Sequence, residues 1–146
     1  GDQLDVVPRV FDGNAFAVFP LAVPAMAPGS PLVARNGRVL VAASEAAQGA
    51  SLNGDVDLLD TALHAVDFAP GLPTLRRIGG VFARAVANHP YALTDAAAVY
   101  FIDEAQENGL DRNNDADAND AILAVFDLAT GAGETLRPLA NSSNTP

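Results

Sequence analysis

An internal repeat constrains the fold of this chain more than any other feature of its sequence. Four polar positions of the first half return at the same spacing in the second half, where Asn53, Asp55, Asp57 and Asp60 are matched by Asn113, Asp115, Asp117 and Asp120. The match continues without a gap, since Leu63, Asp67, Ala69 and Gly71 are matched at the same offset by Leu123, Asp127, Ala129 and Gly131. Because one repeat of this kind corresponds to one supersecondary unit, the sequence predicts two similar structural units in tandem.

Each repeat contains short apolar runs that are separated by turns. The runs of the first repeat are residues 39–43, 62–68 and 74–78, and those of the second are residues 99–102, 122–128 and 134–139. The chain has 12 Gly and 10 Pro, which leave little room for long helices. The β-branched and aromatic residues of the runs favour strands, and the short connections favour hairpins. We therefore predict an all-β fold of antiparallel strands.

An acidic loop lies between two of the predicted strands in each repeat. In the second repeat its oxygen-bearing side chains stand at alternate positions and then at the end of the loop, as Asp111, Asn113, Asp115, Asp117 and Asp120. Alternate spacing lets a tightly coiled loop turn several oxygens toward one point, and calcium takes six to eight oxygens at about 2.3–2.6 Å. Carboxylates held this close without a cation repel one another and raise one another's pKa. The pattern therefore predicts a calcium site.

The loop of the first repeat has the same pattern with one carboxylate fewer. Its candidate ligands are Ser51, Asn53, Asp55, Asp57 and Asp60. Because Ser51 stands where the second loop has Asp111, and fewer charged ligands bind calcium more weakly, we predict two calcium sites of which the second is stronger. Glu45 and Glu104 end the preceding strand of each repeat, and the sequence leaves open whether they reach the ion. A solvated acidic turn is the alternative, because Asn and Asp tolerate left-handed backbone.

The acidic loop resembles the Asp-x-Asn-x-Asp calcium loops of EF-hands, thrombospondin type 3 repeats and integrin-type FG-GAP propeller repeats. Its position between two predicted strands, followed by a Leu-x-x-x-Asp-x-x-x-Gly pattern, is most similar to the propeller-type repeats of secreted bacterial proteins. The resemblance covers residues 38–71 and 97–131. It implies that the first three ligands of the second site are Asp111, Asn113 and Asp115.

The sequence departs from these families at two kinds of position. Val56 and Ala116 stand where a Gly usually follows the third ligand. Ile122 stands at the closing position of an EF-hand loop, so an EF-hand with two flanking helices is not expected. The closing ligands are then expected to be Asp60 and Asp120.

The repeat also suggests how the chain is divided. We interpret residues 1–146 as one β domain of two propeller-blade-like repeats, at about residues 24–83 and about residues 84–143. Residues 81–86 predict a further strand between them. Residues 14–23 hold the corresponding place before the first repeat, so residues 1–23 are a partial unit or an exchanged strand. A closed propeller typically needs at least four blades, so the chain either folds as a compact two-sheet unit or associates with other copies.

Composition excludes several classes of partner and gives no sign of an enzyme. A net charge of −10 argues against binding to nucleic acid or to an anionic membrane, and no apolar run approaches the roughly 20 residues of a membrane-spanning helix. The absence of Cys excludes disulfides and thiolate metal sites. The two histidines, His64 and His89, are not accompanied by a nucleophile elbow or a paired-His pattern.

We therefore expect an extracellular or cell-surface, calcium-binding structural module, with self-association by β-strand addition through residues 4–18 into a filament or surface assembly. A start at Gly1 rather than Met and the sequon that begins at Asn141 favour an extracellular location. The alternative is a glycan- or protein-binding module whose loops calcium makes rigid. A hydrolase is the third possibility.

Overall fold

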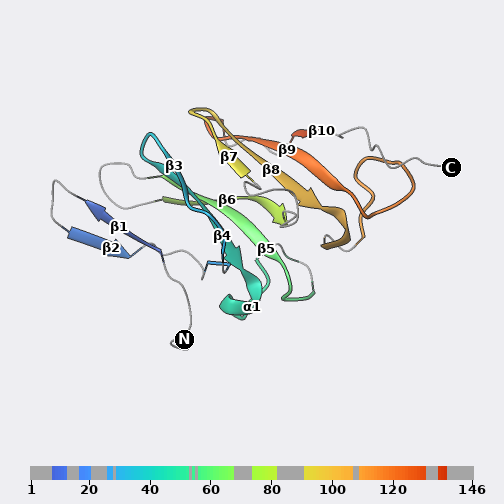
Figure 1. Ribbon diagram of the computed structural model, residues 1–146, viewed down its shortest axis with the longest axis horizontal. Helices are drawn as coiled ribbons and strands as arrows, with labels where there is room; N and C mark the ends of the chain where they lie inside the picture. Colours follow the sequence, from blue (N-terminus) through green and yellow to red (C-terminus); the bar gives the residue numbers. More distant parts are fainter. Residues whose placement is uncertain are drawn as a thin grey trace.

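The computed structural model describes residues 8–12, 17–20, 26–27, 29–52, 54, 56–67, 74–81, 91–106, 109–130 and 135–137. Within these residues the chain forms three antiparallel sheets and very little helix (Figure 1). The prediction of an all-β, antiparallel fold is therefore confirmed. Neither of the two larger sheets closes on itself, since each has two edge strands among the described residues.

The smallest sheet is a hairpin of β1 (Arg9–Asp12) and β2 (Ala17–Pro20). The first four-stranded sheet has the order β3 (Val33–Arg35), β4 (Arg38–Ser44), β5 (Thr61–Asp67) and β6 (Thr74–Val81). The second has the order β7 (Tyr91–Leu93), β8 (Ala97–Asp103), β9 (Ala121–Asp127) and β10 (Thr135–Arg137). The helices are α1 (Glu45–Gln48) and the 3-10 turn η1 (Glu104–Gln106), and no helix of the described part is long and apolar enough to cross a membrane.

The two four-stranded sheets share their strand order and the register of their central pair. Leu40 lies opposite Ala65 in the first sheet, and Val99 lies opposite Val125 in the second. Every pair of β4 with β5 has a counterpart in β8 and β9, from the first pair of the ladder to the last. The repeat found in the sequence therefore relates equivalent positions of two sheets.

Strands β3 and β7 were not predicted from the sequence. The turn between β3 and β4 is Asn36-Gly37, and both residues have positive φ angles, of 46° and 72°. This is the backbone that a two-residue hairpin with Asn-Gly adopts, so the dipeptide was an available signal for β3. The corresponding turn of the second sheet, residues 95–96, is instead closed by the Thr94 hydroxyl, which accepts a hydrogen bond from the Ala97 amide at 2.8 Å.

Two predicted segments have a different extent in the structure. Val81 is the last residue of β6, so a separate strand does not begin there; residues 82–86 lie outside the described residues. Strand β1, which belongs to the segment expected to pair with another subunit, pairs with β2 of its own chain. Residues 1–7 and the sequon at Asn141 also lie outside the described residues.

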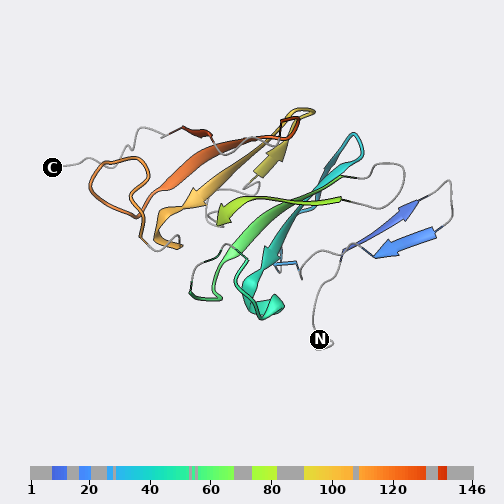
Figure 2. The same ribbon diagram turned by 180° about the vertical axis from the view of Figure 1, so that it is seen from behind.

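The sheets are arranged as successive layers. Both views show the β1–β2 hairpin at one end, the first sheet in the middle and the second sheet at the other end (Figures 1 and 2). The core between the two larger sheets consists of apolar side chains from both: Leu40, Ala42, Leu63 and Ala65 of the first sheet, and Tyr91, Leu93, Ala98, Tyr100, Ile102, Ile122, Ala124 and Leu128 of the second. Fully burying one Leu or Ile side chain contributes about 1.5–3 kcal/mol, so this core holds the two sheets together.

Hydrogen bonds at one end of the stack also join the two sheets. The Arg35 guanidinium forms an ion pair with Asp95 at 2.5 Å, and the Asn36 amide donates to the same carboxylate oxygen at 2.6 Å. The hydrogen bond from Arg35 holds the pKa of Asp95 below its usual range, although desolvation of the carboxyl opposes this. Farther in, the Tyr91 hydroxyl donates to the Pro31 carbonyl. These contacts align the strand turns of the two sheets.

Candidate metal centres

Each acidic loop connects the two central strands of its sheet. The first loop, residues 49–60, follows β4 and α1, and the second loop, residues 109–120, follows β8 and η1. The two ends of each loop meet through a backbone hydrogen bond: the Glu45 amide donates to the Asp60 carbonyl and the Glu104 amide donates to the Asp120 carbonyl, both at 3.0 Å. The loops therefore leave and re-enter their sheets in the same way.

A fully buried glutamate stands at the start of each loop. Glu45 and Glu104 are both 0% exposed. Glu45 Oε1 accepts the Leu52 amide and Glu104 Oε1 accepts the Arg112 amide, both at 2.5 Å, and Glu104 Oε2 accepts the Asp120 amide at 3.3 Å. Burying a carboxylate costs several kcal/mol unless it is paired and hydrogen-bonded. These glutamates thus anchor their loops.

The second repeat absorbs its one extra residue next to this anchor. The Gly49 amide donates to the Glu45 carbonyl four residues earlier, at 2.7 Å, whereas the Gly109 amide donates to the Glu104 carbonyl five residues earlier, at 3.2 Å. Both glycines have left-handed backbones, with φ of 67° and 66°. The wider turn accommodates the extra residue. The spacing between equivalent residues of the two repeats is therefore one residue smaller before the loop than within the loop and after it.

The alternate polar side chains of the second loop each fold back on the backbone. An oxygen of each accepts the amide two residues later, as seen for Asn113 and Asp115 at 3.0 Å, Asp115 and Asp117 at 3.2 Å, and Asp117 and Asn119 at 3.0 Å. Such side-chain turns compete with regular secondary structure. They coil the loop tightly, as the spacing predicts. In the first loop Asp57 accepts the Leu59 amide at 2.8 Å in the same way.

The first side chain of each loop closes a wider turn. Asp111 accepts the Asn114 amide at 2.6 Å and the Ala116 amide at 3.0 Å. In the first loop the Ser51 hydroxyl accepts the Gly54 amide at 3.0 Å. Ser51 therefore keeps one of the backbone contacts of the aspartate that it replaces but brings no charge.

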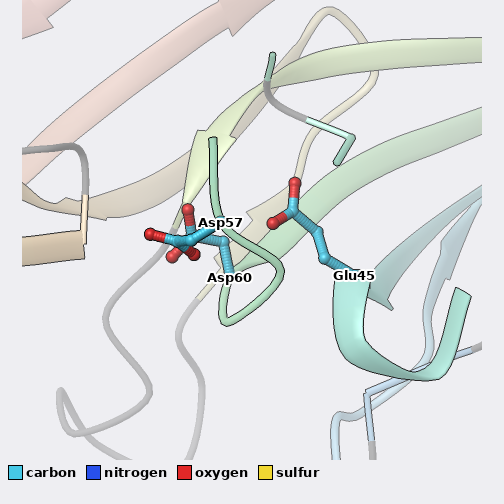
Figure 3. A group of neighbouring side chains, drawn as sticks. All are labelled: Glu45, Asp57 and Asp60. Carbon is cyan, nitrogen blue, oxygen red and sulfur yellow. The ribbon is translucent and has the colours of Figure 1, made fainter. Parts of the chain in front are cut away.

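Three carboxylates gather at the base of each loop. Ligand oxygens of Glu45, Asp57 and Asp60 all lie within 4.8 Å of one another, and so do those of Glu104, Asp117 and Asp120. In Figure 3 the Glu45 side chain points from the end of its strand toward the two aspartates of the loop. Asp60 is only 2% exposed. Three negative charges so close together, and partly away from water, repel strongly unless a proton or a cation joins them.

Asn113 lies beside the second carboxylate group. Its amide nitrogen donates to Asp120 at 2.8 Å and to Asp115 at 3.1 Å. The hydrogen bond from Asn113 is the largest effect on the pKa of Asp120 and lowers it, but desolvation, the hydrogen bond with Asp115 and the charges of Asp115 and Asp117 together raise this pKa above its ordinary value. The charged form of Asp120 is therefore less favourable than that of an ordinary aspartate.

The structure thus brings part of each predicted ligand set together. Asp57 and Asp60 meet in the first loop and Asp117 and Asp120 in the second, while Asp111, Asn113 and Asp115 shape the second loop around its carboxylates. Asn53 and Asp55 lie outside the described residues. The glutamates, which the sequence left undecided, complete both groups. Their repeated position at the end of a strand was a sequence signal that they belong to these groups, but their burial could not be predicted from the sequence.

These groups offer only oxygen ligands, which suit hard cations such as calcium and magnesium rather than zinc or copper. His64 lies in β5 with its Nδ1 3.2 Å from the Ala62 carbonyl oxygen, and it belongs to neither carboxylate group; His89 lies outside the described residues. Comparison of the chain with protein-family models, with curated proteins and with solved structures found no match, so any function must be argued from these residues.

Proposed function

We propose that the chain is an extracellular structural module whose two acidic loops each bind one calcium ion. One observation carries the proposal: the same group of one buried glutamate and two aspartates occurs at the same connection of both sheets. Each of these glutamates accepts an amide of its own loop, and its charge adds to those of the two aspartates beside it. A buried carboxylate strengthens the attraction for a divalent cation.

The ion would join segments that are distant along the loop. Glu45 follows β4 and Asp60 precedes β5, so a cation held by both would clamp the central strands of the first sheet. Glu104 and Asp120 have the same relation to β8 and β9. Binding that is restricted to the folded state stabilises it by about 2.7 kcal/mol when the free ion is at a hundredfold excess over Kd. Calcium would thus act as a structural clamp.

The smaller number of carboxylates in the first loop supports the extracellular location. The first loop has Ser51 in place of the aspartate of the second loop, and Ser51 contributes no charge. Calcium sites of extracellular modules bind at roughly 10⁻⁴–10⁻³ M, whereas intracellular sensors bind more tightly. A site with a carboxylate fewer suits a surrounding in which calcium is abundant.

The stacked sheets suggest the type of structural module. Two four-stranded meanders with the same register and a shared core resemble consecutive propeller blades, which agrees with the resemblance of their loops to propeller-type repeats. Two such units are fewer than the four that a closed propeller typically requires. We therefore propose an open stack that associates with other copies in a filament or surface assembly.

A second candidate function is a protein-binding module whose first loop calcium makes rigid. The tip of this loop displays three apolar side chains, Val56, Leu58 and Leu59, with exposures of 97%, 41% and 82%. Neighbouring exposed apolar side chains mark interaction sites more often than isolated ones. Replacing Leu59 with Ser would weaken capture of a partner and leave calcium binding unchanged, whereas it would change neither property of a purely structural module.

Calorimetric titration of chelator-treated protein with calcium tests the main proposal. We expect two binding events and a rise in Tm on the order of 10 °C at saturating calcium. Glu104→Gln keeps the shape of the anchor and removes its charge, so it should abolish the stronger event alone. A titration without heat, together with a Tm that millimolar calcium leaves unchanged, would rule out the structural role of calcium.

A further inference from the structure

The sequence contains three Asn-Gly dipeptides, at residues 36–37, 53–54 and 108–109. Asparagine is one of the thermolabile residues of proteins, because the backbone nitrogen of the following residue can attack its side-chain amide. A following glycine leaves that nitrogen most accessible, since glycine has no Cβ beside it. The three dipeptides are therefore the first candidates for such a reaction.

The glycine amides of the second and third dipeptides are held by hydrogen bonds. The Gly54 amide donates to the Ser51 hydroxyl at 3.0 Å, and the Gly109 amide donates to the Glu104 carbonyl at 3.2 Å. The attacking species is the deprotonated nitrogen, and a hydrogen bond that the neutral amide donates disfavours the loss of its proton. These two nitrogens are therefore protected.

The amide of Gly37 differs from both. Gly37 lies in the turn whose flanking residues, Arg35 and Arg38, are paired, and its amide donates no hydrogen bond within the described part of the chain. Asn36 and Gly37 are both exposed. Water and hydroxide therefore reach a glycine nitrogen that is free to lose its proton.

The asparagines of the second loop are also followed by amides that are held. Asn113, Asn114 and Asn119 precede these amides in the sequence. The amides donate to side chains of the loop and its base, from Asn114 to Asp111 at 2.6 Å, from Asp115 to Asn113 at 3.0 Å and from Asp120 to Glu104 at 3.3 Å. Among the asparagines that the structure describes, Asn36 thus stands apart.

Ring closure requires a change in the backbone of the turn, and the position of the turn makes this change inexpensive. Strand β3, which leads into it, is an edge strand of three residues, two of which are exposed. Segments with few buried contacts open locally at a small cost in free energy. Asp95, which accepts the Asn36 amide at 2.6 Å, has a side-chain exposure of 61%, and exposed polar contacts are weak. The turn therefore opens more easily than the acidic loops, whose glutamates are 0% exposed.

We propose that Asn36 is a site of spontaneous deamidation through a cyclic imide with Gly37. The Gly37 nitrogen loses its proton to hydroxide and bonds to Cγ of Asn36, while the bond from Cγ to Nδ2 breaks and ammonia leaves with a proton from water. Water then opens the imide at either of its carbonyl carbons, which yields aspartate or isoaspartate. The net reaction consumes water and releases ammonia, and it needs no enzyme or oxidant.

The reaction alters the contact between the two four-stranded sheets. The Asn36 amide and the Arg35 guanidinium both donate to Oδ1 of Asp95. Deamidation replaces the first donor by a carboxylate, which repels Asp95 and competes with it for Arg35. The isoaspartate product also lengthens the backbone by a methylene group, which disturbs the two-residue turn. Ageing of the protein thus loosens this turn and the junction between the sheets.

Peptide mapping of the folded, full chain after incubation at mildly alkaline pH tests the site. We expect the peptide that contains Asn36 to be lost first and replaced by its aspartate and isoaspartate forms, the second of which an isoaspartyl methyltransferase labels. Asn36→Gln is the control and should remove this labelling, because the longer side chain needs a larger ring. An Asn36 peptide that stays intact, or that reacts after the peptides of Asn53 and Asn108, would overturn the proposal.

Ser51→Ala tests the protective role of the hydrogen bonds. It releases the Gly54 amide, so it should speed the reaction of Asn53 and leave the rate at Asn36 unchanged. An unchanged rate at Asn53 would mean that a held amide does not explain the selectivity.

Asn36→Asp reproduces one product and tests its effect on the fold. We expect a Tm lower by about 1–4 °C, since exposed charge pairs contribute up to about 1 kcal/mol. Combined with Asp95→Asn, the same substitution should leave Tm unchanged, because the repulsion is then absent. An equal loss with and without Asp95→Asn would overturn the effect on the junction. Both substitutions lie outside the carboxylate groups, so calcium titrations of these variants should match the wild type, and a failure of calcium binding would leave this proposal unaffected.

Discussion

The two acidic loops have the same base and different tips. At the base, each has a buried glutamate, a left-handed glycine and an aspartate that meets the glutamate through the backbone. At the tip, the first loop has Val56, Leu58 and Leu59, whereas the second has Ala116, Ala118 and Asn119. The residues at the base, which connect the strands and form the candidate metal site, are thus the same in both loops. The residues at the tip, which face solvent or a partner, differ. The comparison therefore separates the candidate metal site from the exposed surface of each loop.

The largest effect is expected from removing an anchor. Glu104→Ala deletes the acceptor of the Arg112 and Asp120 amides, and Glu45→Ala deletes the acceptor of the Leu52 amide. Because hydrogen bonds to a charged group contribute about 1.5–3 kcal/mol each, Glu104→Ala should lower the free energy of unfolding in chelator by roughly 3–5 kcal/mol, and Glu45→Ala should lower it as well. Urea unfolding measures both, and an unchanged free energy of unfolding in either variant would contradict the anchoring role of its glutamate.

Exchanging the first side chains of the loops should exchange part of their affinity. Ser51→Asp adds a carboxylate to the first loop, and Asp111→Ser removes one from the second. One charged ligand contributes about 1.4 kcal/mol, or tenfold in Kd, so calcium titrations of the two variants should show the first site strengthened and the second weakened. Ser51→Ala is the control for the loss of the hydroxyl. Unchanged affinities in the exchanged variants would show that these positions serve the turn and not the ion.

A smaller effect concerns strain at the tip of the second loop. Ala116 has a φ of 78°, in the region where a side chain costs about 1–2 kcal/mol. Ala116→Gly relieves this strain but makes the unfolded chain more flexible, at a cost of about 0.4–1 kcal/mol. Thermal unfolding should therefore show a net gain of about 0.5 kcal/mol. Ala118→Gly, a change of the same kind two residues later, should lower stability, and a gain there would contradict the role of strain.

The smallest effect is a dependence on pH that distinguishes Asp120. Since the pKa of this carboxyl is raised in the folded chain, its contribution is fully present below the ordinary Asp pKa of 3.8 and is lost as pH rises through the higher folded value. In chelator, the stability of the wild type relative to Asp120→Asn should therefore fall as pH rises from about 4. Calcium should reverse this trend, because the ion stabilises the charged form. A difference between the two proteins that is independent of pH would exclude the raised pKa.

Much of the fold and part of each candidate site could be predicted from local patterns in the sequence. The four central strands and both loops follow from apolar runs, Gly and Pro positions and alternate Asp and Asn residues, all of which act over a few residues. Strand β7 was missed because three residues are too short for a periodic pattern, whereas β3, equally short, had the Asn36-Gly37 turn as its signal. The burial of Glu45 and Glu104 was inaccessible for a different reason, since it depends on the residues that pack around a strand end.

The amino-acid order alone therefore accounts for the two similar units, their antiparallel strands and their acidic loops, because backbone preference and side-chain turns are local. The stacking of the two four-stranded sheets came from long-range packing. Leu40 and Val99 hold equivalent places in register, yet the first is completely buried and the second is partly exposed. Both are aliphatic side chains in a strand, and only the layer that lies against each of them makes the difference. Burial is a property of contacts between distant segments, and local sequence patterns do not specify those contacts.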